Sequence, residues 1–98
     1  MKIALDWDGT VTRDVGFWEV FVLMCKNHGH DVRIVTLRHE RQIDDDMRKF
    51  DIPIICTGNK QKRTHLREIE WFADIFIDDS PEFIVDLDFH KYVLAMKD

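Results

Sequence analysis

Short apolar runs alternate with longer amphipathic segments along the whole chain. The apolar runs have the length of strands and occupy residues 2–5, 31–36, 53–56, 74–78 and 92–96. Apolar residues at helical spacing predict helices over residues 14–27, 40–50 and 60–69, and a short helical turn over residues 81–87. Gly29 is placed to end the first of these helices. Strand and helix therefore alternate from one end of the sequence to the other.

This alternation predicts an α/β fold. Strands that alternate with helices form a parallel sheet with helices on both faces. The runs are continuously apolar, as in parallel strands that are buried on both faces. We therefore expect a three-layer, doubly wound, Rossmann-like sandwich with a central, mainly parallel five-stranded sheet. The chain has 98 residues and shows no repeat or linker, so we expect one domain over residues 1–98.

Composition and charge narrow the class of protein. Apolar residues make up 45% and charged residues 34% of the chain, which is typical of a globular protein. The net charge of −5 argues against generic nucleic-acid binding and against an anionic membrane surface, since both need a basic field. No apolar run is long enough to span a membrane or to serve as a signal peptide, so we expect a cytoplasmic protein. Cys25 and Cys56 form no C-x-x-C motif and are expected to be free, buried thiols.

Charged and hydroxyl side chains gather at the predicted strand ends. They stand at or just after a strand end, or near a helix start: Asp6, Asp8, Thr36, Asp78, Asp79, Lys60 and Lys62. Ligands of open parallel sheets bind at the carboxyl ends of the strands. Carboxylates packed together repel one another unless a cation lies among them, and oxygen ligands favour Mg²⁺. A lysine and a threonine nearby suit a phosphate group, so the sequence predicts a site for Mg²⁺ and a phosphate.

The order of these residues resembles the haloacid dehalogenase (HAD) superfamily of phosphatases. The D-x-D-x-T motif of that family is matched by residues 6–10, and its strand ending in Thr or Ser by residues 33–36. Its third motif, a lysine at a helix start, is matched by Lys62 or Lys60. Its acidic pair after an apolar strand is matched by residues 75–79. The match runs from Ile3 to about Glu82 and implies a HAD-like hydrolase domain.

The resemblance implies a chemical role for each acidic residue. Asp6 would be the nucleophile that forms an aspartyl-phosphate, and Asp8 would be the general acid and base. The carboxylates of Asp6 and Asp78, with the backbone carbonyl of Asp8, would hold Mg²⁺. Asp79 would complete the metal shell, directly or through water.

The resemblance also implies which residues would bind the phosphoryl group. Thr36 would donate a hydrogen bond to a phosphoryl oxygen, and the motif lysine would neutralise developing charge. Lys62 is favoured as that lysine because it heads the apolar stripe of its helix, whereas Lys60 lies nearer the preceding turn and stays a phosphate-binding candidate.

Three further residues are candidates for contact with the phosphate. Gly9 would let the backbone turn tightly beside it, and Thr10 belongs to the same loop. Arg38, two residues after Thr36, would either bind phosphate or anchor its own loop.

The activity that the resemblance implies is a Mg²⁺-dependent phosphomonoester hydrolase. Many HAD proteins carry a cap domain, but residues 12–31 and 37–61 are too few to house one. An uncapped, open site suits a phosphorylated macromolecule, or a small molecule if a partner covers the site, and a nucleotide or other small phosphate is the preferred substrate. The alternatives are a phosphotransferase of the same superfamily and a non-catalytic HAD-like binding or scaffold module. A response-regulator receiver is disfavoured because no acidic residue follows the third strand at residues 56–58.

The first predicted helix is apolar nearly all round. Its residues 17–25 include only one charged side chain, Glu19. A helix that is apolar on every side is usually fully buried, yet a single helix on a sheet keeps one face in water. We therefore expect a partner on this face, with a homodimer as the leading interpretation.

Overall fold

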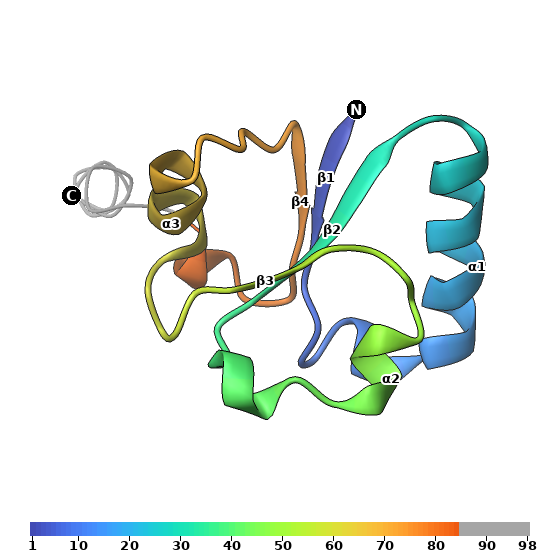
Figure 1. Cartoon of the computed structure of the whole chain (residues 1–98), viewed down its shortest axis with the longest axis horizontal. Helices are drawn as coiled ribbons and strands as arrows, with labels where there is room; N and C mark the ends of the chain where they lie inside the picture. Colours follow the sequence, from blue (N-terminus) through green and yellow to red (C-terminus); the bar gives the residue numbers. More distant parts are fainter. Residues whose placement is uncertain (85–98) are drawn as a thin grey trace, which may run out of the picture.

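The computed structural model describes residues 1–84 (Figure 1). Its strands are β1 (Lys2–Leu5), β2 (Asp31–Thr36), β3 (Ile54–Cys56) and β4 (Ile75–Ile77). Its α-helices are α1 (Val15–Asn27), α2 (Asp45–Arg48) and α3 (Lys62–Glu68), and its 3-10 turns are η1 (Val11–Arg13), η2 (Glu40–Gln42) and η3 (Pro81–Phe83). Four predicted strands are thus confirmed, with small shifts at their ends. The fifth predicted strand, residues 92–96, and the end of the predicted turn, residues 85–87, lie outside the described residues.

The four strands form one parallel sheet in the order β3-β2-β1-β4. The first strand is central, since Leu5 is level with Ile34 on one side and with Ile77 on the other. This arrangement confirms a small α/β protein with a parallel sheet and is compatible with a Rossmann-like fold. Because all four strands run the same way, their carboxyl ends reach one edge of the sheet together.

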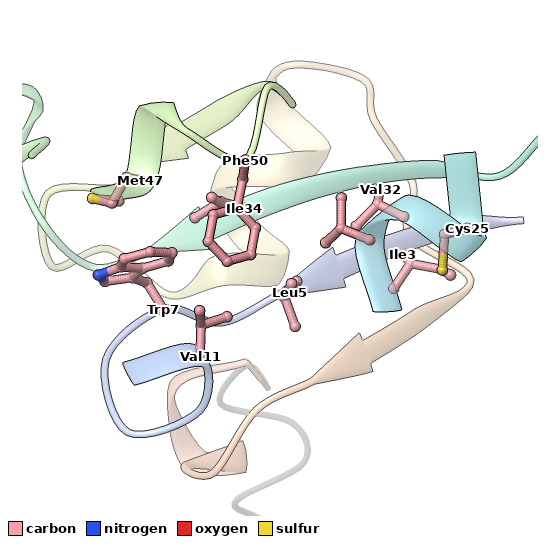
Figure 2. Close-up of a cluster of buried hydrophobic side chains, with 10 residues drawn as sticks. Ile3, Leu5, Trp7, Val11, Cys25, Val32, Ile34, Met47 and Phe50 are labelled. Carbon is pink, nitrogen blue, oxygen red and sulfur yellow. The ribbon is translucent and has the colours of Figure 1, made fainter. Parts of the chain in front are cut away.

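Helices cover both faces of the sheet (Figure 1). The first face packs against α1 and α2 through one cluster of buried side chains, drawn in Figure 2: Ile3, Leu5, Trp7, Val11, Val22, Cys25, Val32, Ile34, Met47 and Phe50. The opposite face packs against α3 through Ala4, Val35, Leu66 and Trp71. Successive residues of a strand point to opposite faces, which is why Ala4 lies in one cluster and its neighbours in the other.

Trp7 anchors the loop that follows β1. Its ring is 2% exposed and meets the ring of Phe50 edge-on, with centroids 5.3 Å apart. A large apolar anchor directly between Asp6 and Asp8 fixes the backbone from which both carboxylates project.

The prediction of one continuous helix over residues 40–50 is wrong. The chain instead forms η2 and then the single-turn α2, with Ile43 in an extended conformation between them (φ −68°, ψ 127°). The cause is Asp44, whose side chain accepts a hydrogen bond from the Met47 amide at 2.9 Å and so begins a new helix there. A run of three aspartates offers such caps, which compete with a continuous helix.

The first helix has the ends that its sequence predicts. Asp14 accepts a hydrogen bond from the Phe17 amide at 3.2 Å, and Gly29 adopts a left-handed φ of 78° just beyond the helix. The outer face of α1 is apolar and open, because Phe17, Val20, Leu23 and Met24 are each more than half exposed. The partner expected on this face stays a prediction.

Among the described residues, no helix has both the length and the apolar character that a membrane crossing needs. The two cysteines are free, with Cys25 buried and Cys56 half-buried.

Candidate functional site

A cavity of about 220 Å³ opens at the carboxyl edge of the sheet. Its walls come from the ends of β1, β2 and β4 and from the start of α3: Asp6, Asp8, Thr36, Leu37, Lys62, Asp78, Asp79, Ser80 and Phe83. The fold therefore brings together six of the residues that the sequence singled out, namely Asp6, Asp8, Thr36, Lys62, Asp78 and Asp79. Leu37, Ser80 and Phe83 were not predicted, since no motif marks their side chains.

Lys62 forms the centre of this site. Its ammonium donates to Asp6 Oδ1 at 2.7 Å and to Asp78 Oδ2 at 2.5 Å, and all three side chains are less than a tenth exposed. Lys62 is the first residue of α3 and Leu66 follows one turn later on the same buried face, so packing of the helix points the lysine at the strand ends. A buried ammonium between two carboxylates compensates their charges.

The Asp6 carboxyl is buried, and its environment acts on its pKa in opposite directions. Burial has the largest effect and raises the pKa, the hydrogen bond and charge of Lys62 lower it, the charge of Asp78 raises it, and the hydrogen bond from Thr10 lowers it. The net result is a pKa of about 6. The Thr10 hydroxyl donates to Asp6 Oδ2 at 2.9 Å. Both oxygens of Asp6 are therefore held by donors, which fixes the carboxylate at the bottom of the cavity.

Thr10 was expected to contact a phosphate, and the structure shows a different position. Its side chain lies beneath Asp6 and does not line the main cavity. The motif spacing correctly placed Thr10 in the loop. The direction of its hydroxyl depends on the η1 turn, in which the backbone N–H groups of Thr10 and Thr12 donate to the Trp7 carbonyl.

Gly9 and Asp79 are in close contact. Gly9 has a φ of 83°, and a Cβ built on it would lie 2.3 Å from Asp79 Oδ2. Only a residue without a side chain leaves room for this carboxylate against the loop. Gly9 therefore makes room for the Asp79 side chain. The sequence had predicted a different role for Gly9, namely a tight backbone turn beside the phosphate.

Three carboxylates form the metal-binding candidate of the described residues. Asp6, Asp78 and Asp79 each offer one oxygen, and these oxygens lie within 4.8 Å of one another. One ammonium, that of Lys62, faces this group, so the cluster keeps an excess of negative charge. Oxygen donors with excess negative charge fit a hard divalent cation such as Mg²⁺. The Ser80 amide donates to Asp78 Oδ1 at 2.9 Å and orients that carboxylate.

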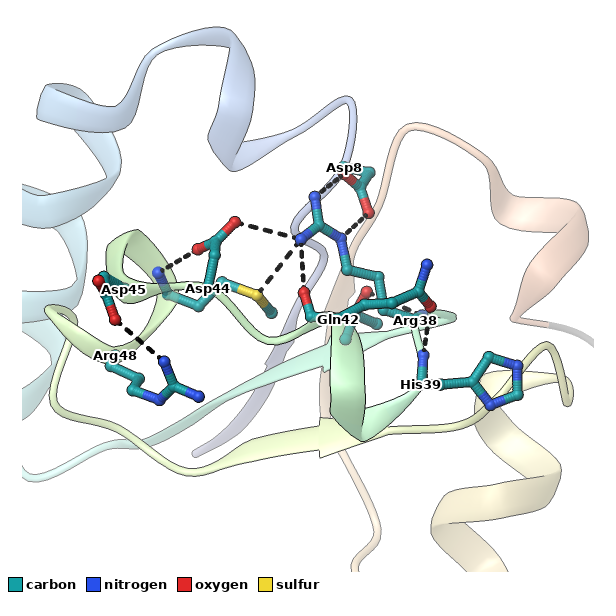
Figure 3. A network of polar contacts seen from close by, with 9 residues as sticks. Asp8, Arg38, His39, Gln42, Asp44, Asp45 and Arg48 are labelled. Carbon is teal, nitrogen blue, oxygen red and sulfur yellow. Dashed lines mark hydrogen bonds and ion pairs between the residues drawn. The ribbon is translucent and has the colours of Figure 1, made fainter.

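Asp8 lies at the mouth of the cavity and is engaged by Arg38. The guanidinium donates through Nε to Asp8 Oδ2 at 2.9 Å and through Nη2 to Oδ1 at 2.8 Å (Figure 3). The hydrogen bonds from its guanidinium to Asp8 raise the pKa of Arg38, so its charge is permanent. The sequence left open whether Arg38 binds phosphate or anchors a loop, and the structure shows that it links two loops of the site.

Thr36 ends β2 at the floor of the cavity. It is 1% exposed, and its Oγ1 accepts a hydrogen bond from the Arg38 amide at 3.2 Å. The hydroxyl hydrogen is therefore available for an acceptor inside the cavity. This placement agrees with the role that the resemblance implies for Thr36.

Lys60 lies away from the cavity. Its ammonium donates to Glu68 Oε2 at 2.8 Å on the surface of α3, and it does not line the site. The expectation that Lys60 binds phosphate is therefore not supported by its position. Because α3 begins only at Lys62, Lys60 belongs to the preceding turn and faces a different direction.

Compared with known proteins, the chain matches no protein-family model, no curated protein and no solved structure. What the chain does must therefore be inferred from the residues of the site and their geometry.

Proposed function

We propose that the chain is a Mg²⁺-dependent phosphomonoester hydrolase that works through an aspartyl-phosphate on Asp6. The observation that carries this proposal is the buried Lys62 ammonium held between Asp6 and Asp78 on the wall of an open cavity. Such a cluster is costly to bury, and a purely structural role would be filled more cheaply by apolar residues. A site that handles a multiply charged anion and a cation accounts for it.

The residues present fit a bound Mg²⁺. The carboxylates of Asp6, Asp78 and Asp79 would hold it, together with the backbone carbonyl of Asp8. When bound, the ion would offset the charge of the substrate phosphate and of the carboxylates.

The first step forms a covalent intermediate. An oxygen of Asp6 attacks phosphorus, the bond from phosphorus to the leaving oxygen breaks, and that oxygen takes a proton from Asp8. Lys62 and the Thr36 hydroxyl stabilise the negative charge on the phosphoryl oxygens in the transition state. The products of this step are the free alcohol and the aspartyl-phosphate.

The second step releases inorganic phosphate. Asp8, now ionised, accepts a proton from water as the water oxygen attacks phosphorus, and the bond from phosphorus to Asp6 breaks. Asp6 is thereby regenerated as a carboxylate, and Asp8 is protonated for the next turnover. Thr10 holds Asp6 in place through both steps.

The parallel α/β sheet is compatible with a Rossmann-like fold, and membership of the HAD superfamily is part of the proposal. A five-stranded HAD-like sheet in a single domain and a cytoplasmic location remain part of the proposal. Among the described residues, only α1 and η1 separate β1 from β2, and only η2, α2 and β3 separate β2 from α3, so these intervals hold no cap domain. An open mouth, with the Asp8 side chain 56% exposed, suits a nucleotide, another small phosphate or a phosphate on a larger molecule.

The test is hydrolysis of a chromogenic aryl phosphate by the whole chain, with Mg²⁺ and with a chelator. We expect turnover that needs Mg²⁺ and disappears in Asp6→Asn. The matched control is Asp45→Asn, an exposed aspartate on α2 paired with Arg48 outside the cavity, which keeps full activity.

Three results would contradict the proposal. Equal turnover in wild type and Asp6→Asn would mean that Asp6 is not the nucleophile. A folded, Mg²⁺-loaded protein without turnover on any phosphate ester would favour the non-catalytic binding module. Turnover that needs an added alcohol, with phosphate recovered on that alcohol, would instead indicate a phosphotransferase.

A further inference from the structure

Both carboxylate oxygens of Asp8 are engaged by one guanidinium. The two parallel hydrogen bonds from Arg38, at 2.9 and 2.8 Å, form the bidentate geometry in which arginine binds carboxylates and phosphates (Figure 3). Residue 8 belongs to the loop after β1, and residue 38 to the loop after β2. The pair therefore closes a bridge across the mouth of the cavity.

Arg38 is held in place independently of Asp8. Its Nη1 donates to the Gln42 carbonyl at 2.9 Å and to Asp44 Oδ2 at 3.2 Å, and it lies 3.8 Å from the sulfur of Met47. Asp44 is itself fixed as the cap of α2. If the Asp8 bridge opens, Arg38 keeps these partners and stays where it is. Asp8 is the exposed, movable member of the pair.

This bridge conflicts with the task of Asp8 in the proposed reaction. The group that serves the leaving oxygen must bring one of its own oxygens to that atom. In the bridge, both oxygens accept hydrogen bonds, so Asp8 must first leave Arg38 and take up a proton from water before it can donate one to the leaving oxygen. A phosphomonoester with a neutral leaving group that draws Asp8 away leaves two guanidinium N–H groups without an acceptor, and that loss opposes the change.

An anionic group on the substrate would remove this conflict. Arg38 does not itself line the cavity, but it contacts Asp8, the lining residue that serves the leaving oxygen, and so lies next to the side where the leaving group must be. A carboxylate or a second phosphate there can accept the same two N–H bonds, since arginine binds both groups with the same fork geometry.

We propose that Arg38 selects phosphomonoesters whose leaving group carries a second anionic group, which replaces Asp8 on the guanidinium and frees Asp8 for the reaction. This inference rests on the proposed phosphatase function and names the substrate class of the same site. The anion can be a carboxylate or a phosphate, and the test separates the two.

The experiment compares matched pairs of substrates that differ in one anionic group. The carboxylate arm compares 3-phosphoglycerate with glycerol 3-phosphate, and the phosphate arm compares fructose 1,6-bisphosphate with fructose 6-phosphate. We expect kcat/KM to favour the doubly anionic member of at least one pair by about tenfold or more. In Arg38→Gln the ratio of the two kcat/KM values should fall to near one. In Arg38→Lys, which keeps the charge but loses the two parallel N–H donors, the ratio should lie between those of wild type and Arg38→Gln. Arg41→Gln, an exposed neighbour on η2, is the control that keeps the preference.

The ratio within a pair does not depend on how much of each variant is folded. If Arg38 only held the two loops together, Arg38→Gln would lower kcat/KM equally for both substrates of a pair. The wild-type preference would then remain, and this result would overturn the inference. Wild-type protein that hydrolyses an aryl phosphate but treats both pairs alike would overturn it while leaving the proposed function standing. Absence of turnover on the aryl phosphate and on all four of these substrates would overturn the proposed function and this inference with it.

Discussion

Lys62 and Asp6 form a buried ion pair of 2.7 Å between residues 56 positions apart in the sequence. The same ammonium reaches Asp78, so one positive charge serves two carboxylates that come from neighbouring strands. Removing the ammonium leaves both carboxylates buried without a counter-charge. The stability of the fold and the chemistry of the cavity therefore depend on the same few atoms.

Replacing Lys62 should damage the fold more than replacing any surface lysine. In Lys62→Met the carboxylates of Asp6 and Asp78 face each other without a cation, and we expect the free energy of unfolding to fall by about 3–5 kcal/mol without Mg²⁺. Lys60→Met is the matched control, since Lys60 pairs with Glu68 at the surface. This substitution should lower the free energy of unfolding by less than about 1 kcal/mol. Urea denaturation of both variants measures the difference, and equal losses would contradict the central role of Lys62.

Mg²⁺ should stabilise the folded protein. A cation that binds the native site raises the free energy of unfolding by about 2.7 kcal/mol at a hundredfold excess over its Kd. The thermal midpoint should rise with Mg²⁺ and return after addition of a chelator. In Asp6→Asn, which removes one of three crowded carboxylates, the midpoint should start above that of wild type and no longer respond to Mg²⁺. An unchanged Mg²⁺ response in this variant would place the metal elsewhere.

A methyl group at residue 9 should disturb the acidic cluster. In Gly9→Ala the new Cβ would meet the Asp79 carboxylate, and the φ of 83° is strained for alanine, so we expect a loss of about 1–3 kcal/mol and weaker Mg²⁺ binding. Gly16→Ala is the opposite case, because nothing lies within 4 Å of its Cβ position in α1. That substitution should stabilise the helix by about 0.5–1 kcal/mol. Calorimetric unfolding and Mg²⁺ titration of the two variants would separate the effects.

Acid should weaken the sheet through Asp31. Hydrogen bonds from Arg33 and from Trp71 Nε1 lower the pKa of Asp31 below its ordinary value of 3.8. The stabilisation is therefore present above pH 3.8 and is lost as the pH falls through the lower native pKa. Asp31→Asn should cost about 1 kcal/mol at neutral pH and flatten the decline of stability in acid.

The control for this pH dependence is Asp45→Asn. Asp45 is almost fully exposed and its pair with Arg48 is an i,i+3 surface contact. Its replacement should therefore leave the decline of stability at acid pH unchanged. Unfolding midpoints measured between neutral pH and pH 2 distinguish the two variants. A decline of equal slope in Asp31→Asn and wild type would contradict the assignment to Asp31.

Local pattern was enough to predict the strands and the carboxyl-edge residues. The apolar runs of β1, β2 and β4 are short and continuous, and parallel strands necessarily bring their ends together. Asp6, Thr36 and Asp78 therefore reached one cavity as the sequence predicted. The position of Lys62 followed from the helical spacing to Leu66.

Interactions between distant residues were not predictable in the same way. The bridge from Arg38 to Asp8 joins side chains 30 residues apart and depends on a loop anchored by Asp44. Asp44 is also the residue whose side chain begins α2 and so interrupts the continuous helix expected over residues 40–50. Short polar side chains that bond either their own backbone or a distant partner leave no periodic trace in a sequence.

The central place of β1 has a consequence for the order in which the protein is made. Lys2 contacts Asp74, 72 residues later, and the Asp6 amide donates to the Ile77 carbonyl. A growing chain on the ribosome thus carries Asp6 and Asp8 long before it carries Lys62 and Asp78. The acidic end of β1 meets its counter-charge, Lys62, and its second neighbouring strand, β4, only late in translation, so every nascent chain that ends before residue 79 lacks the assembled site.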